Sequence, residues 1–489
     1  MHENPTSDPA EIHDLCIVGT GIAGLNALHA ARQYLPTEAR VALVDRREGP
    51  GGMWTNTYDY VRLHQPFEMF TAGDIAWRLD RPRDYLATGA EVRAHLDHCC
   101  DTLVSGMSLT RLFGYEAGPC EEEHTKHGVV GRVTCRPVSG DGEAVTVRAR
   151  RLINATALDV PVPPSLDLSS CDVVSTTPHE LRATGQLDSA MPAFVIGGGK
   201  TGMDTVLALR AARPDRPITL INGKGTVFAN RDRFLPRGVG RWWRGQLLLK
   251  TFGDLAMRFN GRNAREVFDY FHETYAISPD GRGVQFFFGL MSEAENAAVA
   301  QAVERIMPGY LSDVVDAPAG PEMVLRDGSR HSIAPGSVFI NCTGHLLRND
   351  PPDTTCLSPN GACLSISSRS AVHFLPSVAT YFLTHLYFRD ALRDSGVYEI
   401  DLARLFREDR QAWNMTAVTQ SFLNTIRIVD ALPMGVVNGC GLDLDRWFPL
   451  PRRALGMLDL KVNRRRYLDH CRRALDTVGA DHQIRCGPI

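Results

Sequence analysis

The sequence lacks the cysteine and histidine patterns that hold metal ions or form redox-active dithiols. Its twelve cysteines include no CxxC pair, and apart from the adjacent Cys99 and Cys100 they are scattered along 489 residues. There is no HExxH motif, and no acidic cluster accompanies His373 and His385. These absences argue against a disulfide-reductase dithiol, a structural zinc site and any other metal site. Reduced thiols in the cytosol are the expectation.

Long apolar runs and a strong excess of one charge are also missing. No run approaches the roughly 18 apolar residues of a transmembrane helix, and the formal net charge is −3, so we expect neither a membrane span nor a nucleic-acid partner. Residues 1–14 lack the basic and apolar regions of a signal peptide, which favours a cytoplasmic location. The chain is long enough for two or three domains of roughly 100–200 residues each.

The most informative feature present is a glycine turn between an apolar strand and a helix. Gly19, Gly21 and Gly24 follow the apolar run 16–18 and precede the helical stretch 25–28. In the dinucleotide-binding fingerprint the first glycine permits the tight turn, the second lets the backbone approach a pyrophosphate, and the third lets the helix pack on the strand. The pyrophosphate then binds the free N–H groups at the helix N-terminus.

Residues after this turn extend the dinucleotide pattern. The next predicted strand ends at Asp45, about 20 residues beyond the glycines, where the carboxylate that binds a nucleotide ribose belongs; Arg46 follows it. Gly52, Met53 and Trp54 complete a GGxW element, in which glycines let the backbone run close to a flat ligand and the tryptophan offers an apolar wall.

Together these motifs resemble the class B flavin-dependent monooxygenases, a family with two dinucleotide-binding domains. The resemblance implies that the first domain binds FAD and that the GGxW segment and the following loop lie along the flavin. In the family this loop carries an asparagine two residues before a proline, whereas here His64 stands at that position and Pro66 is retained. We therefore take His64, with Arg62 and Gln65, as candidate catalytic residues. His64 either donates a proton to a flavin peroxide, marks different chemistry, or is a hydrogen-bonded loop residue without a chemical part.

A second complete fingerprint lies downstream of the first. After the strand 194–196, the expected nucleotide-binding residues are Gly197, Gly199, Lys200, Thr201 and Gly202. The resemblance assigns this site to a nicotinamide nucleotide. The next strand, 218–221, ends near Lys224 instead of an acid, and a basic residue there tolerates the 2′-phosphate of NADPH. Lys224, helped by Arg231 or Arg233, thus favours NADPH, the alternative being a solvated lysine.

Two similar strands bracket the second domain and set the expected domain division. Residues 151–157 and 338–344 are apolar strands that end in small-residue turns, with Ala157 in the first and Thr343 and Gly344 in the second. The sequence predicts an α/β fold of two Rossmann-like dinucleotide-binding domains with a helical insertion. The predicted segments are 1–160 for the first part of the FAD domain, 161–335 for the NAD(P)H domain with an insertion at about 228–318, and 336–489 for the rest of the FAD domain and C-terminal helices.

Further elements follow from periodicity. Residues 84–104, 374–392 and 461–473 predict helices, and 129–150 predicts a hairpin that turns at 140–142. The resemblance implies that the helix at 374–392 points its N-terminus at the flavin, which makes His373, His385 and Arg389 polar candidates near it. The basic, aromatic stretch 231–250 either touches a membrane surface or forms a solvated face.

The resemblance implies an NADPH-dependent flavoprotein monooxygenase that forms a peroxyflavin and oxygenates a small molecule, with an amine or amino-acid nitrogen as the first guess. Residues 169–175 lack the family's Phe-x-Gly-x-x-x-His linker pattern. The alternatives are an NAD(P)H-dependent flavin reductase or dehydrogenase and a non-catalytic flavin-binding module. FAD and NADPH are the expected cofactors. A small-molecule substrate and oxygen are the expected partners, with a homodimer as an open possibility.

Overall fold

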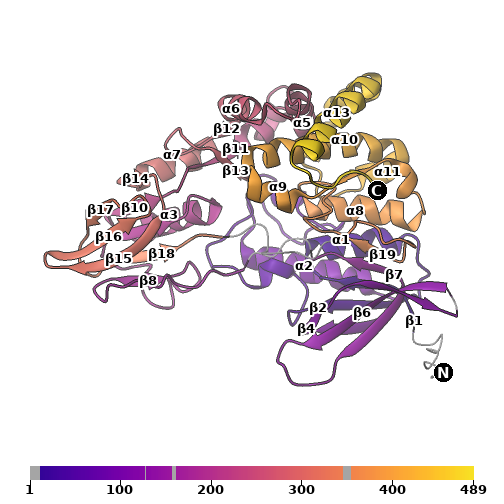
Figure 1. Ribbon diagram of the computed structural model, residues 1–489, viewed down its shortest axis with the longest axis horizontal. Helices are drawn as coiled ribbons and strands as arrows, with labels where there is room; N and C mark the ends of the chain where they lie inside the picture. Colours follow the sequence, from indigo (N-terminus) through magenta and orange to yellow (C-terminus); the bar gives the residue numbers. More distant parts are fainter. Residues whose placement is uncertain (1–11, 127, 157–160, 345–353) are drawn as a thin grey trace.

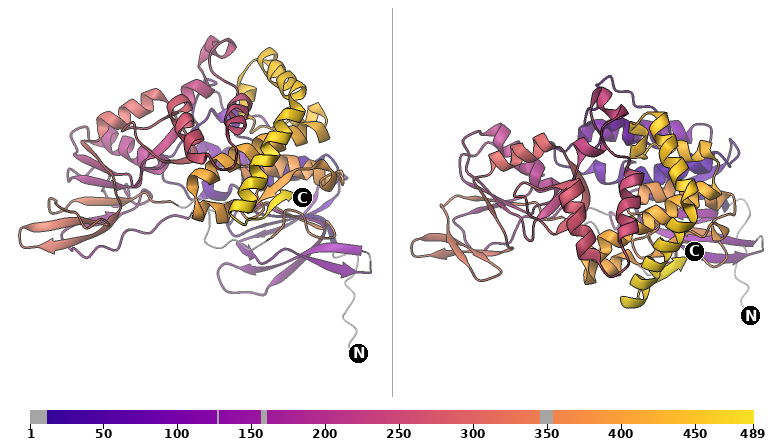
Figure 2. Two further views of the ribbon diagram at one scale, coloured as in Figure 1. Left: turned by 45° about the horizontal axis from the view of Figure 1, so that its top comes forward. Right: turned by 90° about the horizontal axis from the view of Figure 1, so that it is seen from above.

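Two sheets, one mixed and one entirely parallel, organise the chain, and each contains a strand that runs into a glycine turn. The computed structural model describes residues 12–126, 128–156, 161–344 and 354–489. The first sheet lies at the lower right of Figure 1 and the second at the left, and a layer of helices built from residues far apart in sequence lies above them. Figure 2 shows the same arrangement from two further sides.

The first sheet follows the order β3-β2-β1-β7-β6-β4, with β19 paired to β7 and β5 to β6. Its parallel strands are β1 (Ile12–Val18), β2 (Arg40–Asp45), β3 (Ser108–Phe113), β7 (Val145–Asn154) and β19 (Cys363–Ser365). Helices α1 (Ile22–Arg32), α2 (Gly89–Val104) and α8 (Pro376–Phe388) cover one face of this sheet with a shared apolar core. Because β19 comes from the C-terminal third, this domain is completed by residues that follow the second domain in the sequence.

Antiparallel strands extend the first sheet at its edge. They are β4 (Tyr115–Ala117), β5 (Glu121–Thr125) and β6 (Gly128–Pro137). The predicted hairpin is confirmed, since β6 and β7 pair antiparallel across the turn at 140–142. The strand expected at 151–157 is the continuation of this hairpin strand and ends at Asn154; Ala157 lies outside the described residues.

The second sheet is entirely parallel and follows the order β14-β10-β9-β18-β8. Its strands are β8 (Val174–Thr176), β9 (Ala193–Ile196), β10 (Ile218–Ile221), β14 (Arg305–Met307) and β18 (Val338–Asn341). Helices α3 (Lys200–Ala212) and α7 (Glu293–Ala302) share one apolar core with it. A small antiparallel sheet of β15 (Leu311–Ala317), β16 (Gly320–Leu325) and β17 (Arg330–Ser332) packs on the opposite face. The prediction of two Rossmann-like domains is confirmed.

The expected insertion contains strands as well as helices. A small sheet is formed by the strands β11 (Thr226–Asn230), β12 (Ala276–Ile277) and β13 (Gln285–Met291). Between β11 and β12 the chain forms the helices α4 (Arg231–Phe234), α5 (Leu248–Arg258) and α6 (Ala264–Tyr275). Only the segment up to β13 stands apart from the second sheet, because α7 and β14 belong to that sheet's own packing. The domain boundaries themselves stay a prediction.

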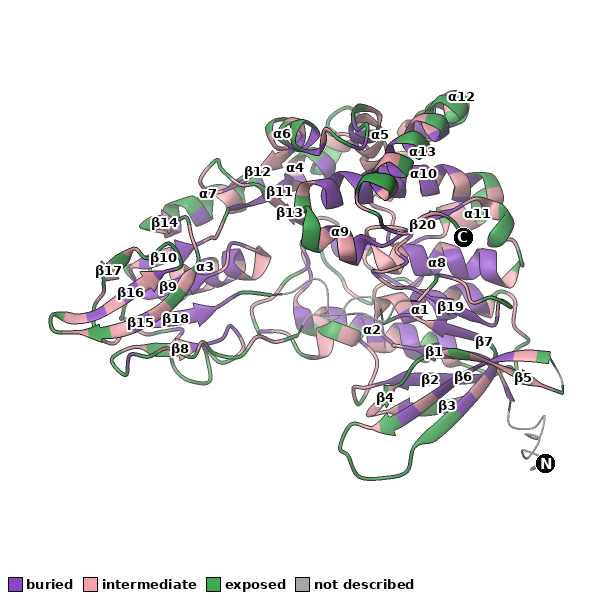
Figure 3. Ribbon diagram, in the orientation of Figure 1, coloured by how far each residue is buried: buried purple, intermediate pink, exposed green. Residues whose placement is uncertain are grey.

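The insertion and the C-terminal helices share the largest apolar core of the described residues. Helices α5 and α6 pack against α10 (Arg410–Ala431), which also contacts α13 (Arg464–Asp481). The remaining elements of this region are α9 (Leu402–Glu408), α11 (Met434–Asn438), α12 (Leu450–Val462), β20 (Tyr398–Ile400) and β21 (Cys486–Pro488). Figure 3 shows that α10 is buried along most of its length, whereas α12 is largely exposed.

Predicted helix boundaries differ from the structure for identifiable reasons. The helix expected at 84–104 begins only at Gly89. Residues 85–88 run extended beside the loop that carries the candidate catalytic residues, because the N–H of Leu63 donates to the Ala87 carbonyl and the N–H of Phe67 donates to the Tyr85 carbonyl. Thr88 then caps the helix in a capping box with Glu91. The basic helix expected at 461–473 is divided between α12 and α13 at Asn463.

Candidate functional site

One large cavity of about 970 Å³ joins the two sheets and the insertion. Both glycine turns, the 51–54 segment, the 61–65 loop, the ends of β7 and β18, and the inner sides of β13, α5 and α10 line this cavity. Most of the sequence-predicted site residues therefore face a common space. The lining includes Gly19, Gly21, Asp45, Arg46, Gly52, Met53, Trp54, Arg62, His64, Gln65, Gly197, Gly199, Lys200, Thr201, Thr343 and Gly344.

The first glycine turn has the geometry that its sequence requires. Gly19 adopts a φ of +90°, a conformation that side-chain-bearing residues rarely take, and its N–H donates to the Val44 carbonyl at 2.7 Å. A Cβ on Gly24 would lie 1.8 Å from the Gly19 carbonyl oxygen, so only glycine allows α1 to pack this closely. The turn and the helix start are thereby fixed against β1 and β2.

Asp45 binds the glycine turn itself. Its buried carboxylate accepts hydrogen bonds from the Thr20 N–H at 2.7 Å and the Thr20 hydroxyl at 2.8 Å, while its other oxygen accepts from the Arg47 N–H at 3.0 Å. Asp45 also lines the cavity. The acid at the end of β2 thus holds the turn in place at the position where a ribose would lie.

The second glycine turn repeats the first in backbone geometry. Gly197 has a φ of +119°, and a Cβ on Gly202 would lie 2.1 Å from the Gly197 carbonyl oxygen. Gly199 differs, because a Cβ there would meet no atom within 4 Å. The turn therefore opens directly into the cavity at its second glycine.

Helices α1 and α3 begin without a side-chain cap. Their N-cap residues are Gly21 and Gly199, which cannot accept the free N–H groups of the first turn. By contrast, α2 and α7 have complete capping boxes at Thr88 and Ser292. Uncapped N–H groups and the positive end of the helix dipole bind anions. Two such helix ends at one cavity are suited to two pyrophosphate groups.

The GGxW segment packs on the first glycine turn. The N–H of Gly51 donates to the Thr20 carbonyl at 3.1 Å, and a Cβ on Gly52 would lie 2.8 Å from the Gly21 Cα. The glycines here allow two backbone segments to approach each other beside the cavity. Trp54, one turn further on, contacts Phe70 edge to face at 5.6 Å between ring centroids and provides an apolar wall.

His64 is held neutral by its surroundings. Its Nδ1 accepts the Leu290 N–H at 3.1 Å, and its carbonyl accepts from the Arg231 guanidinium at 3.2 Å. Burial, together with the cations Lys200 and Arg231, lowers the pKa of His64 to about 4. A neutral imidazole that accepts at Nδ1 carries its proton on Nε2. His64 can therefore donate a hydrogen bond from Nε2, but it is not a charged acid near neutral pH.

The other two catalytic candidates differ in their contacts. Arg62 lines the cavity, yet its guanidinium donates to the Leu86 carbonyl at 3.0 Å and lies 5.7 Å from the Tyr85 ring centroid. Gln65 lines the cavity beside His64. Arg62 thus fixes the loop against the residues before α2.

Charged side chains cluster between the two glycine turns. Lys200 forms an ion pair with Asp204, which also accepts from the Tyr58 hydroxyl at 3.0 Å, and burial raises the pKa of this carboxyl. Arg231 binds Glu295 at 2.7 Å. Burial would raise the pKa of Glu295, but Lys200 and Arg231 hold it below its usual value. This network connects the nucleotide domain to the loop that carries His64.

A basic residue that the sequence did not single out, Arg326, lines the cavity near Gly223. Lys224 is exposed and does not line the cavity, and neither do Arg231 and Arg233. Arg326 does line it, with its guanidinium 5.3 Å from the ring centroid of Tyr310, and a Cβ on Gly223 would lie 2.9 Å from that ring. Arg326 lies about 100 residues beyond β10 in the sequence, so no local motif could have identified it.

The two bracketing strands end in the same way. Asn154 at the end of β7 accepts from the Thr156 N–H at 3.2 Å, and Asn341 at the end of β18 accepts from the Thr343 N–H at 3.1 Å. The Asn341 amide also donates to the Pro164 carbonyl at 2.8 Å. The similarity seen in the sequence therefore corresponds to the same asparagine–threonine turn at the end of each strand.

The part of the cavity formed by the insertion and the C-terminal helices, which we call the apolar chamber, has aromatic and aliphatic walls. Its lining residues are Phe234, Leu248, Thr251, Phe252, Leu255, Phe271, Phe286, Phe287, Phe288, Phe374, Phe406, Arg410, Met415 and Val418. Arg410 is the sole charged side chain among them, with its guanidinium 4.7 Å from the Phe406 ring centroid. No carboxylate of the described residues lines this part of the cavity.

A bulge in β13 places two aromatic side chains in the apolar chamber. The register with β11 shifts between Val227–Phe286 and Ala229–Leu290, which leaves residues 287–289 unpaired. Phe288 has a φ of +57°, which is unfavourable for an aromatic residue. Leu290, directly after the bulge, donates to His64. The bulge thus links the chamber wall to the candidate catalytic histidine.

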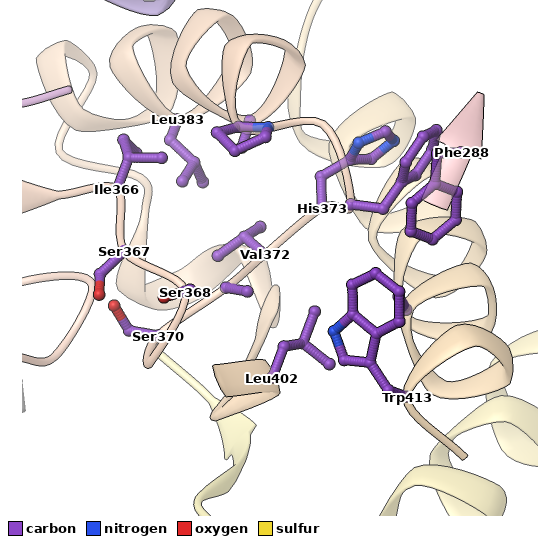
Figure 4. A pocket seen from close by; sticks show the side chains of 15 residues that line it. Phe288, Ile366, Ser367, Ser368, Ser370, Val372, His373, Leu383, Leu402 and Trp413 are labelled. Carbon is purple, nitrogen blue, oxygen red and sulfur yellow. The ribbon is translucent and has the colours of Figure 1, made fainter. Parts of the chain in front are cut away.

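A small cavity of about 60 Å³ adjoins the chamber near the start of α8 (Figure 4). Phe288, Phe374 and Pro376 line both spaces. Burial lowers the pKa of His373 to about 3, and its Nδ1 accepts the Leu375 N–H at 3.0 Å. His373 therefore lines this small cavity, whereas His385 and Arg389 line neither cavity.

The thiols give the site no redox pair. All twelve cysteines lie in the described residues and are free. Cys342 lines the large cavity, and burial raises its pKa to about 12. Among residues 12–126, 128–156, 161–344 and 354–489, no group of three or more histidine, cysteine or acidic side chains could hold a metal ion. No described helix is long and apolar enough to cross a membrane.

Comparison with known sequences supports a Rossmann-like nucleotide-binding domain at the start of the chain. The sequence model of the NAD(P)-binding Rossmann-like domain matches residues 17–88, which include the first glycine turn and the GGxW segment. Uncharacterized proteins of Mycobacterium tuberculosis and Mycobacterium bovis are 26% identical over 361 residues, a match that covers 69% of this chain. The chain spans 62% of the length of these relatives.

Comparison with solved structures finds distant similarity to flavoenzymes. The reduced form of ornithine hydroxylase from Pseudomonas aeruginosa is 14% identical, with a TM-score of 0.47 over 78% of this chain and 98% of that one. The open form of cyclohexanone monooxygenase has the same identity and TM-score over 93% and 98% of the two chains. The bacillithiol disulfide reductase from Bacillus cereus is 11% identical, with a TM-score of 0.44 over 78% and 98%.

Proposed function

We propose that this chain is an FAD- and NADPH-dependent monooxygenase that transfers one oxygen atom from dioxygen to a lipophilic small molecule. The observation that carries the proposal is the single cavity lined by two glycine turns, two uncapped helix N-termini and an apolar chamber. A hydride donor, a flavin and a substrate must meet in one enclosed space for such a reaction.

In this proposal the first turn holds FAD. The N–H groups of α1 bind its pyrophosphate, Asp45 lies at the ribose, and Trp54 and the 62–65 loop lie along the ring. FAD held there would supply the redox chemistry, which is to accept a hydride from NADPH and to activate dioxygen, so that one oxygen atom enters the substrate and the other leaves as water. Neutral His64 donates a hydrogen bond from Nε2 toward the reacting oxygen, and its anchoring by Leu290 keeps the ring in one orientation. The aromatic walls exclude water.

The second turn holds NADPH by the same physics. The N–H groups of α3 bind the pyrophosphate, and Arg326 with Tyr310 binds the adenosine end. We expect Arg326→Gln to raise the KM for NADPH about tenfold or more, because a guanidinium–phosphate contact is lost, and to leave the KM for NADH unchanged. Lys224→Gln is the matched control and should leave both values unchanged. If Lys224→Gln raises the KM for NADPH and Arg326→Gln does not, the 2′-phosphate binds Lys224 and the assignment to Arg326 is wrong.

The chamber favours an apolar substrate over an amino acid. A substrate with an ammonium group in this chamber would lose its hydration without gaining a carboxylate partner. The aromatic lining instead suits an aliphatic or aromatic body, and Arg410 can bind an anionic end. An apolar amine that enters the chamber in its uncharged form remains compatible with oxygenation at nitrogen.

A flavin reductase is the second candidate function. It is favoured by His64, which replaces the asparagine of the related family, and by residues 169–175, which pack along β15 without the family's linker pattern: the N–H of Ser170 donates to the Val314 carbonyl at 2.8 Å. The high pKa of Cys342 disfavours a thiol–disulfide reductase.

Product mass distinguishes the two functions. Purified protein with FAD, NADPH and oxygen is incubated with a panel of lipophilic amines, sulfides, ketones and fatty acids. We expect NADPH consumption to rise with a substrate of the panel, and the product to gain one oxygen atom that derives from ¹⁸O₂. NADPH oxidation with an unlabelled, reduced product would instead establish the reductase. A protein that binds FAD without oxidising NADPH would be a non-catalytic flavin-binding module.

A further inference from the structure

Helix α12 exposes an apolar stripe that no described residue covers. Leu455, Leu458 and Val462 are 64%, 57% and 74% exposed, and Pro451 lies on the same side one turn earlier. The spacing of four, three and four residues places all of them on one face of the helix. The opposite face packs inward through Gly456 and Leu460. Singly exposed apolar residues are common, but a continuous stripe marks an interaction surface.

A second apolar group lies beside this stripe. Val239, Trp242 and Trp243 are at least half exposed, on the short helix Gly238–Trp242 and just after it. Arg452, near the start of α12, donates to the carbonyls of Arg241 at 3.0 Å and of Gly245 at 2.9 Å, so the two segments are joined. They reach the same edge of the molecule in Figure 2, and the exposed surface of α12 is visible in Figure 3. We call the two groups together the apolar edge.

Basic side chains surround the apolar edge. Arg244, Lys250, Lys461, Arg465 and Arg466 are exposed, and none of them forms an ion pair with a residue in the described part of the chain. Residues 450–466 contain six arginines and lysines and one acid, Asp459. The surroundings are therefore strongly positive although the whole chain is slightly acidic.

The charge decides which partner fits. A second copy of the chain would bring the same positive groups face to face, which disfavours self-association. An anionic lipid surface attracts these groups and accepts tryptophan, leucine and valine side chains at the level of its headgroups. An interfacial helix has the composition seen here, with an apolar stripe, exposed tryptophans nearby and flanking arginines and lysines.

The apolar edge also leads to the apolar chamber. The chain passes from Trp243 into α5, whose residues Leu248, Phe252 and Leu255 line the chamber. Leu247, at the start of α5, contacts the backbone of α12 at Gly456. A lipophilic molecule dissolved in a bilayer would thus meet the protein close to the chamber wall.

We propose that the apolar edge, formed by residues 239–243 and the exposed face of α12, docks this protein on the surface of membranes that contain anionic lipids. The docking is peripheral, driven by insertion of the apolar side chains and by attraction of the surrounding basic groups. It does not depend on the proposed reaction, because the surface lies outside the cavity.

Vesicle flotation with the purified full chain tests the proposal. Vesicles of phosphatidylcholine alone are compared with vesicles of equal parts phosphatidylcholine and phosphatidylglycerol. We expect binding to the anionic vesicles that weakens at high salt, and at least about tenfold weaker binding to the neutral ones. The double variants Leu455→Ser/Leu458→Ser and Trp242→Ser/Trp243→Ser should each lose about tenfold or more in affinity for anionic vesicles.

A matched control uses exposed apolar residues elsewhere. Val138→Ser and Val145→Ser alter the hairpin of the first sheet and should leave vesicle binding unchanged. Thermal unfolding followed by circular dichroism checks that each variant is folded. We expect all of them to fold, because the changed side chains are on the surface. The proposal is overturned if anionic vesicles do not bind the protein, or if the edge variants bind as well as the controls. It is also overturned if sedimentation shows a wild-type dimer that the edge variants dissociate, since a second copy would then cover this surface.

Discussion

At the scale of single residues, the second and third glycines of the nucleotide turn have separable roles. A Cβ on Gly202 would overlap the Gly197 carbonyl, whereas a Cβ on Gly199 would enter the open cavity. We expect Gly202→Ala to lower the free energy of unfolding by about 1–3 kcal/mol, because α3 must move away from β9. Gly199→Ala should leave that free energy nearly unchanged in the absence of ligand, yet weaken NADP⁺ binding about tenfold or more, since the new methyl group occupies the position of the pyrophosphate. Urea unfolding and equilibrium titration measure the two effects.

The opposite pattern would contradict this assignment. If Gly199→Ala destabilises the protein without NADP⁺ while keeping its affinity, the second glycine has a structural role and the turn does not open toward the ligand.

The environment of His64 predicts a pH dependence of stability. The folded chain leaves His64 neutral down to a pKa of about 4, whereas an unfolded chain binds this proton near pH 6.5. Between these values the unfolded state holds more protons, so this contribution to stability is complete above about pH 6.5 and is lost as the pH falls toward 4. In His64→Asn, the amide oxygen can still accept the Leu290 N–H, and the site no longer titrates.

The comparison of the two proteins isolates this histidine from the other buried ones. Between about pH 7.5 and 4.5, the wild type should lose about 2 kcal/mol more unfolding free energy than His64→Asn. Urea unfolding of both proteins across this pH range measures the difference in unfolding free energy. Parallel curves for the two proteins would mean that His64 is solvated in the folded state.

At the scale of elements, the bulge in β13 provides a test of backbone strain. Phe288 has a positive φ, which glycine adopts without cost and alanine does not. Both Phe288→Gly and Phe288→Ala lose the ring packing, and we expect the alanine variant to be less stable than the glycine variant by about 1 kcal/mol. At Phe287, which does not have a positive φ, the order should be reversed, because glycine there only adds disorder to the unfolded chain. Urea unfolding of the four variants measures both differences.

The elements that the sequence predicts well are those with strong local signals. The strand–glycine turn–helix units at Gly19 and Gly197 combine an apolar run with glycines whose positions are fixed by backbone contact, and both are confirmed. The sequence places the start of α2 too early, because the carbonyls of Tyr85 and Ala87 accept hydrogen bonds from the loop that contains Leu63 and Phe67. The insertion at about 228–318 is expected to be helical, yet residues 285–286 and 290–291 within it pair with β11 as parts of strand β13.

The candidate site also contains residues that local motifs identify and residues that only the folded chain brings to the cavity. Glycines, Asp45 and Trp54 could be located because the dinucleotide motif is local in sequence. Arg326 and Arg410 could not, because they reach the cavity from separate parts of the chain and belong to no motif. The neutral state of His64 also depends on Lys200, Arg231 and Leu290, which only the folded chain brings together. Long-range packing, therefore, determines the parts of the cavity that we propose to bind the substrate and the adenosine end of NADPH.

At the scale of the whole molecule, the cavity connects the two sheets, so a ligand on one domain should affect the other. The 58–65 segment belongs to the first domain, but Tyr58 donates to Asp204 and Tyr60 contacts Thr205 at 2.9 Å, both on α3. Binding of FAD along the 51–65 segment would order these contacts before NADP⁺ arrives. Affinity changes between two sites are reciprocal, so NADP⁺ should strengthen FAD binding by the same factor.

Removal of FAD tests this coupling and the assignment of the two turns together. At about one hundred times its Kd, FAD should raise the unfolding free energy of the apoprotein by about 2.7 kcal/mol, and NADP⁺ should add a separate increment. Gly199→Ala should keep the increment from FAD and lose most of that from NADP⁺, because only the second turn is changed. Thermal unfolding of apoprotein and holoprotein with and without NADP⁺ measures all four states. If Gly199→Ala instead removes the increment from FAD, the two nucleotides are assigned to the wrong turns, and hydride transfer would run from the first domain to the second.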